Sequence, residues 1–192
     1  GFEKNQAYIQ TAHEKAREQG VAIEISQGEA ERLPFPDNAF GFINMSEVIE
    51  HTERPVDVLG EVLRVLAPGG YCYMSVPNRF GFRDPHFKAY GVNWLPRSAS
   101  MAFLKIIGKE KELVSNAGRQ SLLEMHYFTF GGFRRFAESA GFTAEDCRIL
   151  RIRREIENDT LRHLALSLYR VLRFFYFDSF HLLLQKPVAA KE

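Results

Sequence analysis

The chain has 192 residues, of which 45% are hydrophobic and 26% charged, and its net charge is +1. These values are ordinary for a soluble globular protein with one hydrophobic core, and they give no reason to expect nucleic acid as a partner. The two cysteines, Cys72 and Cys147, lie far apart, which argues against a disulfide framework or a cysteine metal site and suits a reducing compartment. No apolar run approaches the roughly 18 residues needed to span a bilayer, and no signal peptide is visible, so we expect a cytoplasmic protein.

The first segments in chain order read as strand, helix and strand. Residues 1–3 look like the tail of a strand, and Asn5 is a good N-cap for a helix that ends at Gly20. Residues 21–26, Val-Ala-Ile-Glu-Ile-Ser, alternate apolar and other side chains, which predicts a strand. Residues 40–46, Phe-Gly-Phe-Ile-Asn-Met-Ser, predict a second, buried strand.

A helix and a third strand follow. Pro55 suits the first turn of a helix whose apolar residues recur on one side, and Pro68-Gly69-Gly70 ends it before a strand at residues 71–77. Strands and helices that alternate at this pitch predict an α/β fold. We expect a single domain with a Rossmann-like, mostly parallel sheet, helices on both faces and an antiparallel last strand.

The second half is less regular. Residues 79–127 are rich in aromatic residues, proline and glycine, which predicts an irregular or helical insert on the substrate side. The further elements that we expect are helices at 98–107, 115–125 and 130–141, a strand at 144–152, a helix at 159–177, a last strand at 179–187 and a frayed tail at 188–192. The basic cluster Arg148, Arg151, Arg153 and Arg154 is interpreted as the solvated face of the strand at 144–152.

Three stretches carry a family resemblance. They are "GFEKNQAYIQTAHEKA" at residues 1–16, "GEAERLPFPDNAFGFINMSEVIEH" at 28–51 and "EVLRVLAPGGYCYMSVPN" at 61–78. Together they resemble class I S-adenosylmethionine-dependent methyltransferases, especially the branch that includes ubiquinone and menaquinone biosynthesis methyltransferases. Beyond residue 78 the likeness is only architectural.

The resemblance implies a cofactor site for S-adenosylmethionine, with S-adenosylhomocysteine as product. Glu3 matches the acid that accepts hydrogen bonds from the ribose hydroxyls, Glu29 matches the acid that binds the adenine amino group, and the Ala30 N–H would donate to a ring nitrogen. The full expected set is Glu3, Lys4, Glu29, Ala30, Met45 and Ser46. Each acid has a structural alternative: Glu3 could be an acid favoured by the dipole at a helix N-terminus, and Glu29 could be a solvated loop residue. Members of the family more often carry Asp at the position of Glu29.

The family's glycine-rich turn is absent from this sequence. In the family, a central strand and that turn precede the strand that ends at Glu3, and the turn binds the methionine end of the cofactor. A sheet without its central strand leaves backbone groups unpaired, each costing on the order of 1–3 kcal/mol. We therefore expect that the chain is part of a longer protein or that another segment fills the gap, and that residues 1–192 alone bind cofactor poorly.

Candidate groups for a catalytic base are His51, His86, His126 and Tyr127. Each has a structural alternative, such as helix capping by His51 or packing of the insert against the sheet. No metal site is expected.

Aromatic residues crowd the end of the helix at 159–177, where Phe174, Phe175, Tyr176 and Phe177 follow one another. Three interpretations are open: these residues pack on the sheet as part of the core, they form a homodimer interface, or they make peripheral contact with a lipid-like substrate or a membrane.

The leading interpretation is a methyltransferase acting on a small-molecule or lipid-linked acceptor. The alternative is a catalytically inactive relative with a binding or regulatory role.

Overall fold

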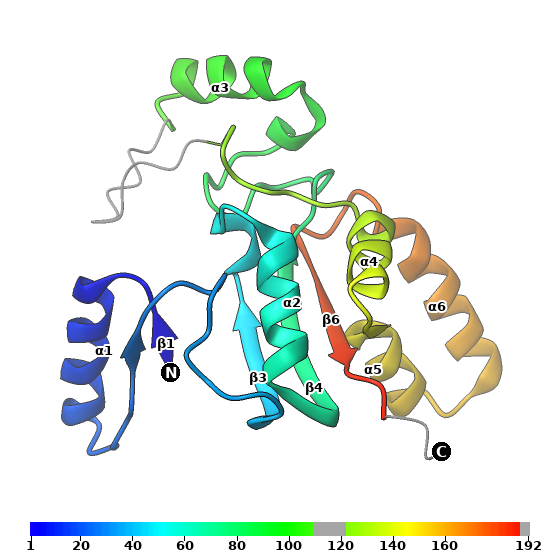
Figure 1. Cartoon of the computed structure of the whole chain (residues 1–192). Helices are drawn as coiled ribbons and strands as arrows, with labels where there is room; N and C mark the ends of the chain where they lie inside the picture. The colour runs from blue at the N-terminus through cyan, green and yellow to red at the C-terminus, as the bar shows by residue number, and fades with distance from the viewer. Residues whose placement is uncertain (110–121, 189–192) are drawn as a thin grey trace.

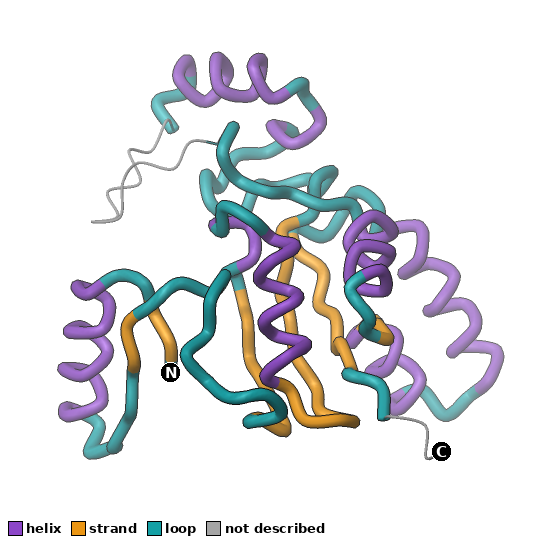
Figure 2. The backbone as a smooth tube through the Cα atoms, in the orientation of Figure 1, coloured by secondary structure: helices purple, strands orange, loops and turns teal. Residues whose placement is uncertain are grey.

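The computed structural model describes residues 1–109 and 122–188. Its strands are β1 (Phe2–Glu3), β2 (Ser26–Gln27), β3 (Phe40–Ser46), β4 (Leu66–Pro77), β5 (Thr143–Asp146) and β6 (Ser179–Gln185). Its α-helices are α1 (Gln6–Glu18), α2 (Pro55–Val65), α3 (Arg97–Ile106), α4 (Phe130–Ser139), α5 (Cys147–Glu155) and α6 (Asp159–Leu172), and two short 3-10 helices are η1 (Ile49–His51) and η2 (Val92–Trp94). Figure 2 shows the helices around the strands.

The strands form two separate sheets. The larger has the order β3-β4-β6-β5, in which β3 and β4 are parallel and β6 runs antiparallel to both neighbours. The predicted antiparallel last strand is therefore confirmed. The smaller sheet pairs β1 with β2 in parallel, and within the part of the chain that the structure describes neither strand pairs with β3.

The core lies between the larger sheet and the helices α2 and α4. Helix α2 contributes Val58, Leu59 and Val62, and α4 contributes Phe133 and Ala137. The facing residues of the sheet are Met45, Cys72, Met74, Val76, Ala144, Phe180, Leu182 and Leu184. The predicted helix that begins at Pro55 and the one at 130–141 are confirmed, because their apolar residues recur at helical spacing and fill this layer.

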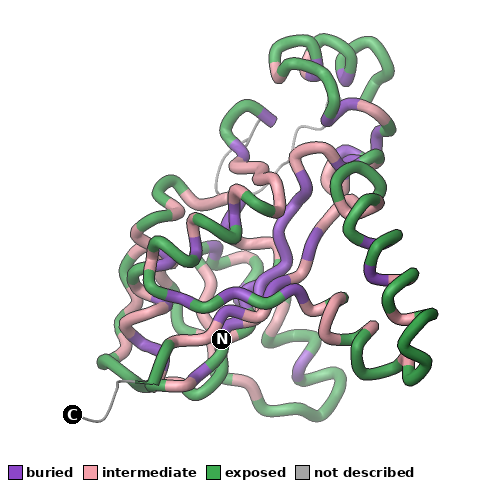
Figure 3. The backbone as a smooth tube through the Cα atoms, turned by 90° about the vertical axis from the view of Figure 1, so that its right-hand side faces the viewer, coloured by how far each residue is buried: buried purple, intermediate pink, exposed green. Residues whose placement is uncertain are grey.

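The opposite face is covered unevenly. Helix α5 contacts β5 and β6, and α6 packs on α5, so these helices cover the end of the sheet away from β3. Phe42 of β3 points to this face and is 60% exposed, and Tyr71 beside it in β4 is also exposed. Figure 3 shows the buried residues concentrated in the central strands.

The predicted strand at 144–152 is wrong beyond Asp146. The Asp146 carboxylate accepts hydrogen bonds from the backbone N–H groups of Arg148 and Ile149, at 2.9 and 3.3 Å, and so caps helix α5. The arginines that we interpreted as a strand face lie on this helix, where Arg151 pairs with Glu155 one turn later. An N-cap followed by this i, i+4 pair selects the helix over the strand.

Three other boundaries differ from the prediction. The strand expected at 21–26 is only Ser26–Gln27, matching the equally short β1 that it pairs with. The helix expected at 159–177 ends at Leu172, because the buried side-chain amide of Asn78 donates to the carbonyls of Arg173, Phe174 and Phe177 and holds them in a turn. The strand expected at 71–77 begins at Leu66.

The segment after residue 78 stands above the end of the sheet toward which β3 points (Figure 1). It has its own small core, formed by Phe87, Ala89, Val92, Leu104, Leu122 and Met125. Helix α3 confirms the prediction at 98–107. The helix predicted at 115–125 falls largely outside the described residues, as does the frayed tail at 189–192.

Candidate functional site

The carboxyl ends of β1 and β2 bring the two predicted cofactor acids to neighbouring positions. Glu3 is in register with Gln27, and the Gly28 N–H donates to the Glu3 carbonyl at 3.1 Å. Glu29 therefore follows the tip of β2 directly beside the tip of β1. Parallel strands that end at one edge place their next residues together, which is the arrangement used by ligand sites of open α/β sheets.

Each acid also has a protein partner. A Glu3 carboxylate oxygen accepts from the Asn5 N–H at 2.8 Å and so helps to begin α1, as in the structural alternative. Glu29 pairs with Lys4 at 2.9 Å, and both side chains are more than half exposed. A hydrogen bond to Lys4 lowers the pKa of Glu29, and the same bond raises the pKa of Lys4. Three members of the expected set thus lie together at this edge.

The rest of the predicted set lies along the loop and on β3. Ala30 packs against the main core, Met45 is buried in β3, and Ser46 is exposed at the tip of that strand. The loop is held to α2 because the Leu33 N–H donates to Glu61 at 2.7 Å and Arg64 donates to the Phe35 carbonyl at 2.8 Å. These contacts fix the loop that follows Ala30 to helix α2.

Glu47 follows β3 with a φ of +55°, in the left-handed region. Its carboxylate accepts a hydrogen bond from the Ser75 hydroxyl on β4. A non-glycine residue in this conformation is uncommon and concentrates at functional sites. The backbone therefore turns sharply at the tip of β3 and carries η1 across the top of the sheet.

A buried carboxylate with two imidazoles lies just beyond this turn. Glu50 in η1 is fully buried, and neither oxygen accepts a hydrogen bond from a described residue. His51 Nε2 and His86 Nε2 lie 3.7 and 3.5 Å from the same Glu50 oxygen, and their rings are 5.0 Å apart and nearly perpendicular. The candidate ligand atoms of these three residues lie within 4.8 Å of one another.

The outer side of His86 is held by Tyr127. The Tyr127 hydroxyl lies 2.9 Å from His86 Nδ1, and the Arg97 guanidinium lies over the tyrosine ring. Burial, with help from the negative charge of Asp84, raises the pKa of Tyr127, so its hydroxyl stays neutral at ordinary pH. Burial lowers the pKa of His86, but the opposing effects of Glu50, Asp84 and Glu47 together raise it above its usual value.

The structure brings together three of the four predicted candidates for a base, namely His51, His86 and Tyr127. His126 donates its backbone N–H to the Glu50 carbonyl at 2.9 Å, while its ring stacks on Phe128. The sequence interpretation missed Glu50 and Asp84, whose oxygen accepts from the N–H groups of His86 and Phe87. The available signal was the Glu-His pair at 50–51, which closes an apolar run.

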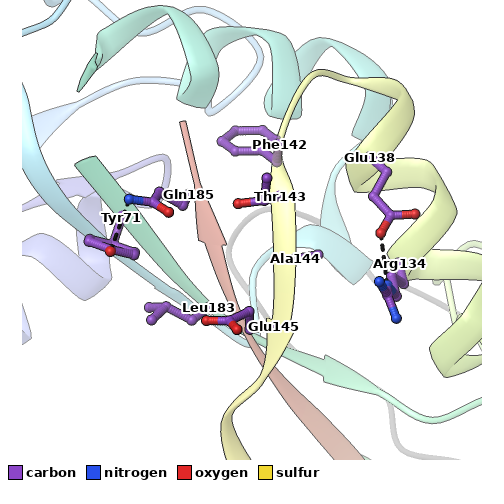
Figure 4. Close-up of a pocket in the computed structure, with 9 residues that line it drawn as sticks. All are labelled: Tyr71, Arg134, Glu138, Phe142, Thr143, Ala144, Glu145, Leu183 and Gln185. Carbon is purple, nitrogen blue, oxygen red and sulfur yellow. Dashed lines mark hydrogen bonds and ion pairs between the residues drawn. The ribbon is translucent and has the colours of Figure 1, made fainter. Parts of the chain in front are cut away.

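Two hollows lie away from the Glu50 cluster. The one in Figure 4 is lined by Tyr71, Arg134, Glu138, Phe142, Thr143, Ala144, Glu145, Leu183 and Gln185. Because β5 begins at Thr143, this hollow lies at the end of the sheet opposite Glu50, and it plays no part in the site. The second lies beside the tips of β1 and β2 and is lined by Phe2, Gln27, Gly28, Arg32, Leu33, Pro34 and Phe35.

Comparisons with known proteins agree with this geometry. Residues 1–74 match the family model described as a methyltransferase domain. One similar relative is the ubiquinone/menaquinone biosynthesis C-methyltransferase of Azotobacter vinelandii, which is 37% identical over 34% of this chain and 27% of that protein. Another is the demethylmenaquinone methyltransferase of Bacillus licheniformis, which is 35% identical over 45% of this chain and 37% of that protein. The matched part thus spans roughly a third of these relatives. The N-terminal part of the chain is thus similar to S-adenosylmethionine-dependent methyltransferases of the quinone-biosynthesis type, as the sequence motifs implied.

Solved structures of methyltransferases share the fold. A solved S-adenosylmethionine-dependent methyltransferase from Methanosarcina mazei superposes with a TM-score of 0.55 at 20% identity, covering 98% of this chain and 81% of that one. At this identity the match bears on the fold alone. The similarity supports S-adenosylmethionine as the cofactor. The tips of β1 and β2, which carry Glu3 and lead to Glu29, belong to the smaller sheet, and Ser46 ends β3 in the larger one.

Proposed function

We propose that this protein transfers a methyl group from S-adenosylmethionine to a small-molecule or lipid-linked acceptor. The observation that carries the proposal is the register of β1 with β2, which sets Glu3 beside the residues leading to Glu29 within the segment that matches the methyltransferase family. Glu3 would accept from the ribose hydroxyls, and Glu29 would accept from the adenine amino group. The paired acids support an active enzyme over the inactive, regulatory alternative.

We also propose that a further strand of the protein pairs with the free edge of β3. In the described residues β3 is the last strand of its sheet, and the exposed Phe42 beside that edge is unusual for a parallel strand. Such a strand would join the two sheets and complete the cofactor site. Binding experiments therefore require the full-length gene product.

The acceptor is proposed to be hydrophobic, for example quinone-like. Exposed aromatic rings of the segment above the sheet support this: Phe82 lies 5.4 Å from Tyr90 and 5.6 Å from Trp94, measured between ring centroids. Helix α6 also exposes one row of aliphatic side chains, Leu161, Leu164, Leu168 and Val171. Large exposed apolar surfaces mark contact with apolar ligands, membranes or subunits. Peripheral membrane contact and a homodimer through α6 both fit this row.

No helix in residues 1–109 and 122–188 is long and apolar enough to cross a bilayer. We propose that the protein works in the cytoplasm.

A methyl-transfer assay tests the proposed acceptor class. The full-length protein is incubated with S-adenosylmethionine carrying a labelled methyl group and with either a demethylated quinone or a small polar amine. We expect label in the quinone, and a raised KM for that acceptor in Tyr90→Ser but not in Tyr8→Ser, a similarly exposed tyrosine on α1. Preferential labelling of the polar acceptor would rule out a hydrophobic acceptor.

A further inference from the structure

Glu50 is the most unusual titratable group in the described part of the molecule. Its side chain is fully buried, and both carboxylate oxygens lack a hydrogen-bond donor there. A buried carboxylate without donors is unfavourable by several kcal/mol unless a cation compensates it. Ordinary buried acids have such partners: Asp146, for example, accepts from Tyr169, Arg173 and two backbone N–H groups.

The two imidazoles approach Glu50 only at a long distance. His86 Nε2 and His51 Nε2 stand 3.5 and 3.7 Å from Glu50 Oε1, beyond the usual hydrogen-bond range of about 2.7–3.2 Å. Two ligand atoms that each lie about 2.1 Å from one ion are themselves about 3.0–3.5 Å apart in octahedral or tetrahedral geometry. The two distances from Glu50 lie at or slightly above the upper end of this range, and all the candidate ligand atoms lie within 4.8 Å of one another, so a small movement of the side chains would bring them onto one ion.

We propose that Glu50, His51 and His86 bind one divalent cation. Two imidazoles and one carboxylate are the ligand set of zinc enzymes and of other borderline transition metals rather than of Mg²⁺, which prefers oxygen ligands. The ion would neutralise the buried Glu50 carboxylate.

The surroundings of His86 fit a metal ligand. Its Nδ1 faces the Tyr127 hydroxyl at 2.9 Å, which leaves Nε2 as the nitrogen directed at Glu50. A hydrogen bond on the far nitrogen commonly fixes the tautomer and orientation of a ligating histidine. The backbone N–H of His86 is in turn held by buried Asp84 at 2.9 Å.

Among the described residues, the cluster reaches solvent at His51. The His51 side chain is 36% exposed, whereas that of His86 is 13% exposed and Glu50 is buried, so an ion can enter from the His51 side. Three protein ligands leave a coordination position for water or substrate, as in catalytic rather than structural sites. At this position the ion would bind an acceptor oxygen and lower its pKa, a role that rests on the proposed methyl transfer, whereas binding of the ion does not.

Metal titration of the full-length, tag-free protein tests the site. After treatment with a chelator, the protein is titrated with Zn²⁺ in a calorimeter and with Co²⁺ in an absorption spectrometer. We expect one ion per chain and visible Co²⁺ bands. Glu50→Gln and His86→Gln should each weaken binding more than tenfold and abolish the bands, and Tyr127→Phe should weaken it about 10–100-fold.

The matched control is His126→Gln, because His126 is adjacent in the fold but its ring faces Phe128. It should bind both ions like the unmodified protein. If Glu50→Gln does not fold, His51→Ala replaces it, since that side chain is partly exposed. Equal affinity of the unmodified protein and the ligand variants, or no saturable binding, would overturn the proposal. Binding of S-adenosylhomocysteine to the chelated protein, measured in parallel, keeps failure of the metal site distinct from failure of the proposed function.

Discussion

Asp146 is a single side chain on which three elements depend. It ends β5, caps α5 through two backbone N–H groups, and accepts from the Tyr169 hydroxyl and the Arg173 guanidinium of the α6 region at 2.8 Å each. Arg173 also lies over the Phe130 ring, 3.6 Å from its centroid. Removal of the carboxylate would leave a largely buried arginine without its anion.

We predict that Asp146→Ala lowers the free energy of unfolding by about 3–5 kcal/mol, because it breaks a buried ion pair and removes an N-cap. Asp146→Asn keeps a capping oxygen but loses the charge, so its effect should be smaller. Urea titration followed by circular dichroism gives both values. Asp159→Asn, which removes an exposed partner of Arg162, is the control and should cost less than about 1 kcal/mol. Equal effects at the two positions would contradict this role for Asp146.

At the residue scale the sequence predicts proximity better than burial. Glu3 and Glu29 could be expected at neighbouring strand tips because parallel strands end at one edge. Glu50 and Asp84 could not be recognised, since nothing in a loop sequence distinguishes a buried carboxylate from a solvated one. Glu50 is buried where distant parts of the chain meet it, namely His86 and the backbone of His126.

At the scale of elements, strong periodicity decided which predictions are confirmed. The helices α2 and α4 bury one apolar face and were predictable from their spacing. Helix α5 was not, because Ile149 and Ile152 between arginines also fit an alternating strand, and the capping role of Asp146 decides the structure. The end of α6 depends on Asn78, which is distant in sequence, so no local pattern could give it.

Strand β6 carries a histidine whose titration should affect stability. His181 Nδ1 lies 2.7 Å from the Tyr73 hydroxyl on β4. Burial lowers the pKa of His181, and the positive charge of Arg148 lowers it further, against smaller opposing effects of Glu47, Asp146 and Asp178. The native state therefore binds the proton less readily than the unfolded chain does.

Because the native pKa of His181 is lowered, we predict that His181 lowers the free energy of unfolding as the pH falls. The loss begins as the pH falls through the unfolded value, about 6.5, and continues toward the lower native pKa. The variant His181→Gln lacks this pH-dependent contribution to the free energy of unfolding. The difference in unfolding free energy between the variant and the unmodified protein should therefore change over that pH interval and be constant above it. His13→Gln, on the exposed side of α1, is the control. A difference that grows toward alkaline pH would refute the assignment.

At the scale of the whole molecule, the described residues form two sheets that meet across a loop rather than through hydrogen bonds. The sequence predicts that a central strand is missing between the strand ending at Glu3 and the strand ending at Ser46. The two sheets are separate at this place. Residues 28–39 join the two parts, through Ala30 in the main core and Leu33 at Glu61. The proposed cofactor site spans this junction, so its affinity depends on how the full-length protein completes the sheet.

Calorimetric binding of S-adenosylhomocysteine to the full-length gene product is the most direct measurement of the proposed site. Glu3→Ala and Glu29→Ala should each weaken binding by about 1–3 kcal/mol, because each removes the acceptor of a donor on the nucleoside. Glu14→Ala, an exposed acid on α1, should leave the affinity unchanged. Unchanged affinity in both Glu3→Ala and Glu29→Ala would show that the adenosyl group is not held at these strand tips.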